Sequence, residues 1–207
     1  MSFIDTVKAS DAKEDVLAMY QREENHWGYV PNYAKLFCYR PALMERWGRL
    51  VAELKRPVDG RRYELVTFAA AYALKHSSCS MAHGNLLAKI IGKQALLALT
   101  RGEISGDLTA AEMAIFKFSA AVAKDASAIT QADVTLLKNE YQLCDEDIFD
   151  IVSIAAGRSF FTKILDGLGS LPDSSFNQLD SELISALTIG RPISQLSVEH
   201  TKSERAS

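Results

Sequence analysis

The chain has 207 residues, of which 48% are hydrophobic and 24% charged. This composition is typical of a soluble globular protein and excludes a disordered, collagen-like or coiled-coil chain. Lysine and arginine (23) nearly balance aspartate and glutamate (26), which leaves a net charge of −3. Because no basic excess exists, neither nucleic acid nor an anionic membrane is expected as a partner.

Two further features predict a cytoplasmic location. Every apolar run is shorter than the ~18 residues that a membrane-spanning helix needs, and the first residues show no pattern of a secretory signal. The three cysteines, Cys38, Cys79 and Cys144, form no disulfide framework. An odd number of cysteines in a chain of this length indicates free thiols in a reducing compartment.

Apolar residues recur at helical rather than strand spacing along the whole chain. The sequence therefore predicts an all-α fold, a compact helical bundle forming a single domain over residues 1–190. A polar, disordered tail is expected over residues 191–207. Helical segments are expected, in chain order, over residues 11–24, 32–37, 41–55, 61–91, 93–99, 109–124, 130–141, 145–168 and 174–187.

Candidate chemistry gathers in the segment 61–91, which contains Glu64, His76, Cys79 and His83. Cys79 and His83 are four residues apart, so on a helix they are neighbours on one face. A thiol beside an imidazole is the basic arrangement for producing a thiolate nucleophile.

The position of Glu64 depends on the path of the backbone. In one straight helix, Glu64 and Cys79 would be roughly 22 Å apart along the axis, at 1.5 Å per residue. If the chain instead turns near residues 76–78, two antiparallel helices bring Glu64 back toward His83. Ser77 or Ser78 would then cap the second helix, with Cys79 in its first turn, where the helix dipole lowers a thiol pKa. The residues leave both paths open.

The segment resembles the active-site pattern of the alkylhydroperoxidase D-like proteins within the carboxymuconolactone decarboxylase superfamily. That pattern is a glutamate, eleven residues, a cysteine, two residues, a second cysteine, three residues and a histidine. Glu64, Cys79 and His83 match the glutamate, the second cysteine and the histidine, whereas His76 replaces the first cysteine. The context from about His26 to Asp173 is similar to the peroxidase-related branch of the superfamily.

The resemblance implies a fold that assembles into dimers, trimers or hexamers, and a thiol peroxidase that needs no metal or other cofactor. Cys79 would be the peroxidatic thiolate, His83 its proton partner and Glu64 the group that orients this relay, with His76 and Ser78 as auxiliary residues. The substrate would be a hydroperoxide or another small molecule. Because residue 76 is not a cysteine, an oxidised Cys79 would need an external thiol reductant, or Cys38 or Cys144 if the fold or a neighbouring subunit delivers one.

Plainer alternatives exist for the same residues. Cys79 is equally typical of a small buried apolar residue, Glu64 of a surface residue in the first turn of a helix, and His76 of a solvent-facing residue. The chain could also be a cofactor-free lyase that uses His83, His76 and Glu64 for acid–base chemistry, as the lactone decarboxylases of the superfamily do. A non-catalytic helical oligomer is the third alternative.

Overall fold

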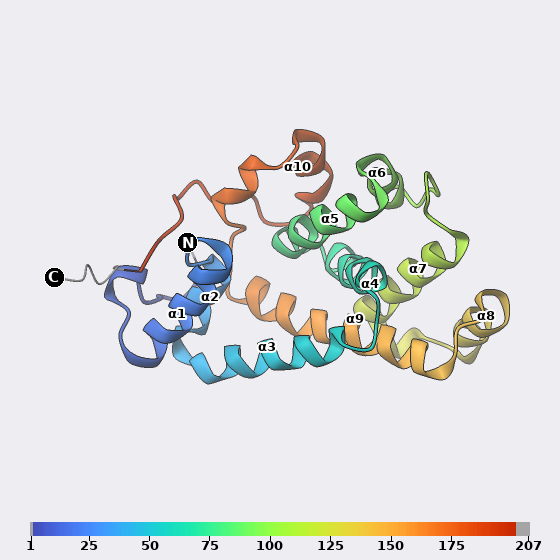
Figure 1. Cartoon of the computed structure of the whole chain (residues 1–207), viewed down its shortest axis with the longest axis horizontal. Helices are drawn as coiled ribbons and strands as arrows, with labels where there is room; N and C mark the ends of the chain where they lie inside the picture. Colours follow the sequence, from blue (N-terminus) through green and yellow to red (C-terminus); the bar gives the residue numbers. More distant parts are fainter. Residues whose placement is uncertain (1, 202–207) are drawn as a thin grey trace. The chain divides into compact units, whose positions relative to one another are not determined.

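A computed structural model describes residues 2–201 and is all-helical over that range, as the sequence predicted (Figure 1). No β-strand occurs between residues 2 and 201, which contain a single isolated bridge between Val30 and Glu199. No helix in this range is long and apolar enough to cross a membrane. The α-helices are α1 (Glu14–Trp27), α2 (Asn32–Leu36), α3 (Pro41–Lys55), α4 (Gly60–Ala73), α5 (Ser77–Ile91), α6 (Lys93–Thr100), α7 (Ala110–Asp125), α8 (Gln131–Tyr141), α9 (Asp145–Gly167) and α10 (Ser181–Leu187).

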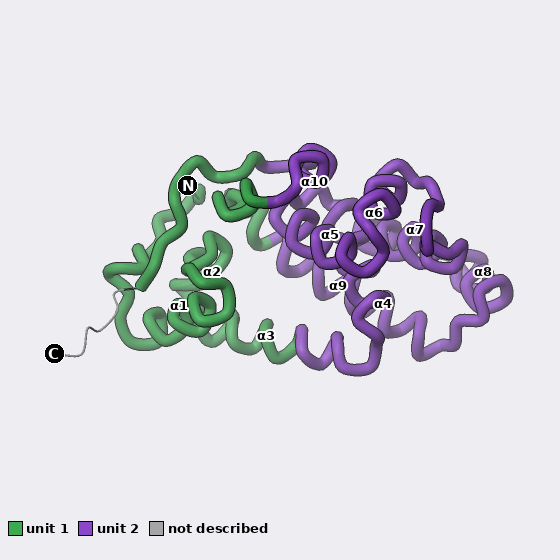
Figure 2. The backbone as a smooth tube through the Cα atoms, turned by 45° about the horizontal axis from the view of Figure 1, so that its top comes forward, with its two compact units in different colours: residues 1–50, 164–178, 192–207 green, residues 51–163, 179–191 purple. Residues whose placement is uncertain are grey.

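The chain divides into two compact units (Figure 2). The single domain over residues 1–190 that the sequence predicted stays a prediction. Unit 1 is formed by residues 1–50, 164–178 and 192–207, and unit 2 by residues 51–163 and 179–191. The division could not be read from composition, because both units combine segments that are far apart in the chain.

Unit 1 includes part of the segment that the sequence predicted as a disordered tail. Ile193 and Ser194 are buried, and Glu199 accepts hydrogen bonds from the Ala9 backbone N–H at 3.0 Å and from Lys35 Nζ at 2.6 Å. The segment up to residue 201 therefore differs from a disordered tail, because the Glu199 side chain forms hydrogen bonds with Ala9 and Lys35, which lie far away in the sequence. Residues 202–207 of the predicted tail lie outside the described residues.

Unit 2 is organised around α4, in which every residue from 63 to 71 is buried. A helix buried on all sides needs neighbours on all sides, and α4 packs against α5 and α7. The side chain of Asp59 accepts a hydrogen bond from the Arg62 N–H and caps the start of α4. The helix ends at Ala73, and the chain then turns back into α5.

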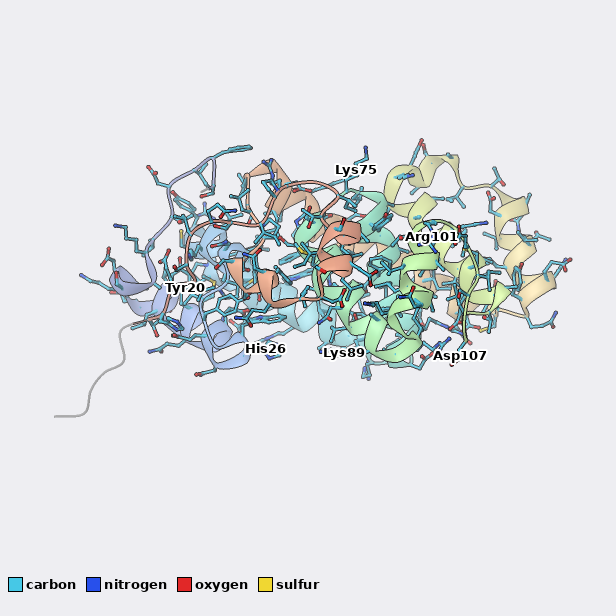
Figure 3. The ribbon with its side chains drawn as sticks, turned by 90° about the horizontal axis from the view of Figure 1, so that it is seen from above. Tyr20, His26, Lys75, Lys89, Arg101 and Asp107 are labelled. Carbon is cyan, nitrogen blue, oxygen red and sulfur yellow. The ribbon has the colours of Figure 1, made fainter. Side chains whose placement is uncertain are left out.

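The turn between α4 and α5 contains neither glycine nor proline. Lys75, labelled in Figure 3, adopts the left-handed conformation with φ of 58°, and the His76 N–H donates to the Ala71 carbonyl at 3.0 Å. Gly190 supports the turn from outside, since its N–H donates to Ser77 Oγ at 2.8 Å. A Cβ atom at Gly190 would lie 1.9 Å from the Lys75 carbonyl oxygen, so only glycine fits there.

The last predicted helix is wrong in its extent. Residues 174–178 form a separate 3₁₀ helix, and α10 begins only at Ser181. The cause is Asp180, whose side chain accepts from the N–H groups of Glu182 and Leu183 and so starts a new helix. The first predicted helix likewise begins late, at Glu14 instead of Asp11.

Candidate active site

Cys79 lies in the first turn of α5 with only 5% of its surface exposed. Its sulfur accepts a hydrogen bond from Arg158 Nη1 of α9 over 3.4 Å. His76 precedes the helix, and its side chain also hydrogen-bonds to the thiol. A buried sulfur atom is therefore held between a guanidinium group, an imidazole and the N-terminus of a helix.

His76 is the residue that caps α5. Its Nδ1 atom accepts the Cys79 N–H at 3.1 Å, so the sequence-based assignment of the cap to Ser77 or Ser78 is wrong. The Ser77 hydroxyl instead accepts from Gly190. Ser78 is half-buried in the first turn of α5, and no hydrogen bond from its side chain to Glu64, His76, Cys79 or His83 occurs among the described residues. His76 is 1% exposed, so it is not the solvent-facing residue of the plainer alternative.

The pKa of the Cys79 thiol reflects these partners. Burial raises it, but the charges of His76 and Arg158 and the hydrogen bonds from both side chains outweigh burial and lower the pKa to about 7. His76 Nδ1 can accept the Cys79 N–H only while it carries no proton of its own. The guanidinium group of Arg158 therefore supplies positive charge beside the sulfur even where His76 is neutral.

Glu64 and His83 form the second part of the site. The turn at residues 74–76 brings α4 and α5 together as an antiparallel pair, and Glu64 Oε2 lies 2.7 Å from His83 Nδ1. Of the two backbone paths that the sequence left open, the chain takes the one that turns. Because a carboxylate only accepts, Nδ1 carries the proton and Nε2 is left as the basic nitrogen.

Burial and the charge of Arg158 lower the pKa of His83 below its ordinary value, and the hydrogen bond and negative charge of Glu64 offset this only in part. The imidazole is consequently neutral near pH 7 and ready to accept a proton. The ring of Tyr63 packs edge-on against His83 with the centroids 6.5 Å apart.

The sequence analysis did not identify Arg158. A signal existed, because Arg158 is the only charged residue between 151 and 162, a segment that otherwise has the composition of a buried helix. A lone arginine in such a segment must find an anionic or polar partner inside the protein. The identity of that partner, 79 residues away in the sequence, could not be deduced without the fold.

Neither of the other cysteines in the chain is bonded in a disulfide. Cys38 is buried in unit 1. Cys144 is exposed at the start of α9, where its sulfur accepts the Asp147 N–H at 3.5 Å. Cys144 precedes Arg158 by fourteen residues on one helix, which is about 21 Å. Since disulfide formation needs Cα atoms less than about 7 Å apart, Cys144 cannot reach Cys79 of the same chain.

Among residues 2–201, no three His, Cys, Asp or Glu side chains are grouped as a metal site would require. The Glu64 and His83 side chains share a hydrogen bond, while the His76 side chain accepts from the Cys79 backbone N–H. Glu64, His76, Cys79 and His83 thus form two separate pairs.

No family model and no curated protein matches the sequence. Solved structures with similar backbones include a peroxidase-related protein with an alkylhydroperoxidase AhpD core from Ralstonia eutropha JMP134, at 21% identity and a TM-score of 0.68. That match covers 84% of this chain and 94% of the other. This chain has the alkylhydroperoxidase D-like fold. The fold predicted from the resemblance is confirmed.

Two other matches have the same helical fold. A peroxidase-related protein from Silicibacter sp. TM1040 is 17% identical with a TM-score of 0.70, covering 86% of this chain and 94% of the other. The debrominase Bmp8 is 14% identical with a TM-score of 0.67, covering 88% of this chain and 96% of the other. Peroxidase-related proteins and a debrominase therefore share this fold, so the function of this chain must be argued from its site.

Proposed function

We propose that the protein is a thiol-dependent oxidoreductase that reduces hydroperoxides with Cys79 as its only redox-active cysteine. The observation that carries the proposal is the placement of the Cys79 sulfur between Arg158 and His76 in the first turn of a helix. A structural cysteine needs no such surroundings, whereas a nucleophilic one needs positive charge beside its sulfur.

In the first step, the Cys79 thiolate attacks the outer oxygen of a hydroperoxide. The S–O bond forms as the O–O bond breaks, which oxidises the sulfur to a sulfenic acid and releases an alkoxide. His83 first accepts the thiol proton and then gives it to the alkoxide, so that an alcohol or water leaves. Glu64 keeps the imidazole in the tautomer and orientation that this exchange needs.

In the second step, an external thiol restores Cys79. One thiol condenses with the sulfenic acid to form a mixed disulfide and water, and a second thiol then releases the Cys79 thiol and the external disulfide. The chain supports this route because residue 76 is a histidine and Cys144 lies too far along α9 to form a disulfide with Cys79.

The proposal is tested by turnover of hydrogen peroxide and an alkyl hydroperoxide with a dithiol reductant, in the wild type, Cys79→Ser and Cys144→Ser. We expect Cys79→Ser to abolish turnover and the control Cys144→Ser to retain it. Turnover that survives Cys79→Ser would contradict the proposal. Activity on a lactone in Cys79→Ser would instead support acid–base chemistry by Glu64 and His83, and inactivity of the wild type on both classes would support a non-catalytic role.

A second candidate reaction uses the same thiolate. The debrominase Bmp8 has the same fold, and a cysteine-to-alanine variant of it is known in complex with 2,3,4-tribromopyrrole. A thiolate can attack a bromine atom of such a ring: the S–Br bond forms as the C–Br bond breaks, and the ring carbon keeps the electron pair and takes up a proton. One external thiol then displaces bromide from the sulfenyl bromide to give a mixed disulfide, and a second thiol releases the Cys79 thiol and the external disulfide. Release of bromide from a brominated pyrrole by the wild type, and not by Cys79→Ser, would assign this reaction to the chain.

A further inference from the structure

Two buried hydroxyl groups, one on α4 and one on α5, have no hydrogen-bond partner among the described residues. Thr67 and Ser80 are both 0% exposed, and neither Thr67 Oγ1 nor Ser80 Oγ makes a hydrogen bond to a described group. Buried polar atoms are nearly always hydrogen-bonded, and a helical threonine or serine can usually bond to the carbonyl one turn earlier. Two other buried helical hydroxyls do so: Ser119 donates to the Ile115 carbonyl and Thr162 to the Ser159 carbonyl.

The register of the two helices places these hydroxyls at the same level along the pair. Glu64 contacts His83 at one end of the pair, and His76 bonds to Ala71 at the other. Thr67 follows Glu64 by three residues, and Ser80 precedes His83 by three. Both steps are about 4.5 Å along antiparallel axes and return to nearly the same helix face.

The hydroxyl pair also lies between the two parts of the candidate active site. On α5, Ser80 is one turn after His76 and nearly one turn before His83, so the three residues form a stripe along one face. On α4, Thr67 continues the face that carries Glu64. Along the two helices, the His76–Cys79 pair comes first and the Glu64–His83 pair last. Thr67 and Ser80 lie at a level between these two pairs.

We propose that Thr67 and Ser80 together bind one buried water molecule, and that this water connects the two pairs by hydrogen bonds. Each hydroxyl can donate one hydrogen bond and also accept, and a water molecule can donate two and accept two. The three groups can therefore satisfy one another's hydrogen bonds. On the proposed function, Thr67 and Ser80 are positioning residues that let a proton pass between the two ends of the site without either hydroxyl changing its own protonation state.

The first test measures thermal stability, which does not depend on the proposed function. In Thr67→Val and Ser80→Ala, loss of the bound water should lower Tm by about 2–4 °C. The double variant should lose little more than the larger single loss, because either change releases the same water. The matched controls Thr162→Val and Ser119→Ala make the same substitutions at hydroxyls that hydrogen-bond to a backbone carbonyl, and they show how much Tm falls when such a bond is lost. An unchanged or raised Tm in Thr67→Val and Ser80→Ala would overturn the water site, since removing an unsatisfied hydroxyl costs nothing.

The second test separates the relay from the site itself. Alkylation of Cys79 at fixed pH should be unchanged in Thr67→Val, whereas peroxide turnover should fall about tenfold and its solvent deuterium isotope effect should change. Turnover and isotope effect equal to those of the wild type would overturn the relay. If the wild type does not turn over peroxide, the proposed function fails, and the Tm comparison together with a crystal structure showing or lacking an ordered water at Thr67 and Ser80 still decides the water site.

Discussion

Arg158 Nη1 and Cys79 Sγ lie 3.4 Å apart, although 79 residues separate them in the sequence. Arg158 is 7% exposed, and its Cζ atom also lies over the ring of Phe161, 5.6 Å from the ring centroid. Burying an arginine is unfavourable unless an anionic or polar partner accompanies it. The thiolate of Cys79 is such a partner, and Arg158 favours the charged form of Cys79.

Replacing Arg158 should therefore raise the pKa of Cys79. In Arg158→Met, the charge and hydrogen bond are lost while burial remains, and the pKa should rise from about 7 to the ordinary value of a thiol or above it. Alkylation of Cys79 at pH 7 should slow by about tenfold or more. Mass spectrometry after pH-dependent alkylation measures this, with Cys144 as the internal control. A Cys79 profile identical to that of the wild type would show that Arg158 does not hold the thiolate.

Introducing a cysteine at position 76 should change how the sulfenic acid of Cys79 reacts after oxidation. His76 Nδ1 already lies 3.1 Å from the Cys79 backbone nitrogen, so a thiol at position 76 would lie across the first turn of α5 from the Cys79 sulfur. We expect His76→Cys treated with one equivalent of peroxide to form a disulfide between residues 76 and 79, which peptide mapping without reductant detects. Persistence of a sulfenic acid at Cys79 in this variant would contradict the expected geometry.

Gly190→Ala should disturb the turn that sets the position of Cys79. The added Cβ would lie 1.9 Å from the Lys75 carbonyl oxygen, which belongs to the backbone and cannot rotate away. We expect a loss of about 2 kcal/mol or more in the free energy of unfolding and an altered alkylation rate at Cys79. Gly60→Ala is the control, because nothing lies within 4 Å of a Cβ at that position. Equal stability of the two variants in urea would show that the turn can move at little cost.

Asp173 should make unit 1 less stable at neutral pH than at acidic pH. Burial raises its pKa to about 6, against the opposing effects of the Asn32 N–H and the charge of Lys35. Because the pKa is higher in the folded state, this contribution is fully present below about pH 4 and is lost as the pH rises through about 6. Asp173→Asn keeps an acceptor for the Asn32 N–H and removes the charge. It should raise the free energy of unfolding by about 1–3 kcal/mol at pH 8 and have little effect at pH 4, as urea titrations at both pH values would show.

Most helices could be predicted from local patterns, such as those over residues 109–124 and 130–141, which begin in the structure with capping boxes at Thr109 and Thr130. The turn at Lys75 could not be predicted, because a lysine with positive φ leaves no trace in composition and its support comes from Gly190. The same limit applies to the site. The motif identified Glu64, Cys79 and His83, but the actual pairing depends on helix register and on Arg158, both of which are set by the tertiary structure.

The way in which unit 1 is assembled has a consequence for folding. The Ala9 N–H bonds to Glu199 across 190 residues, whereas Glu64 and His83 are only 19 residues apart. Contacts between near neighbours in sequence form faster than those that close long loops. During synthesis from the N-terminus, the α4–α5 pair can fold as soon as it leaves the ribosome, but the Ala9–Glu199 contact must wait for nearly the whole chain. The Glu64–His83 pair should thus form early, whereas Cys79 gains its Arg158 partner and the support of Gly190 only when the later part of the chain has been made.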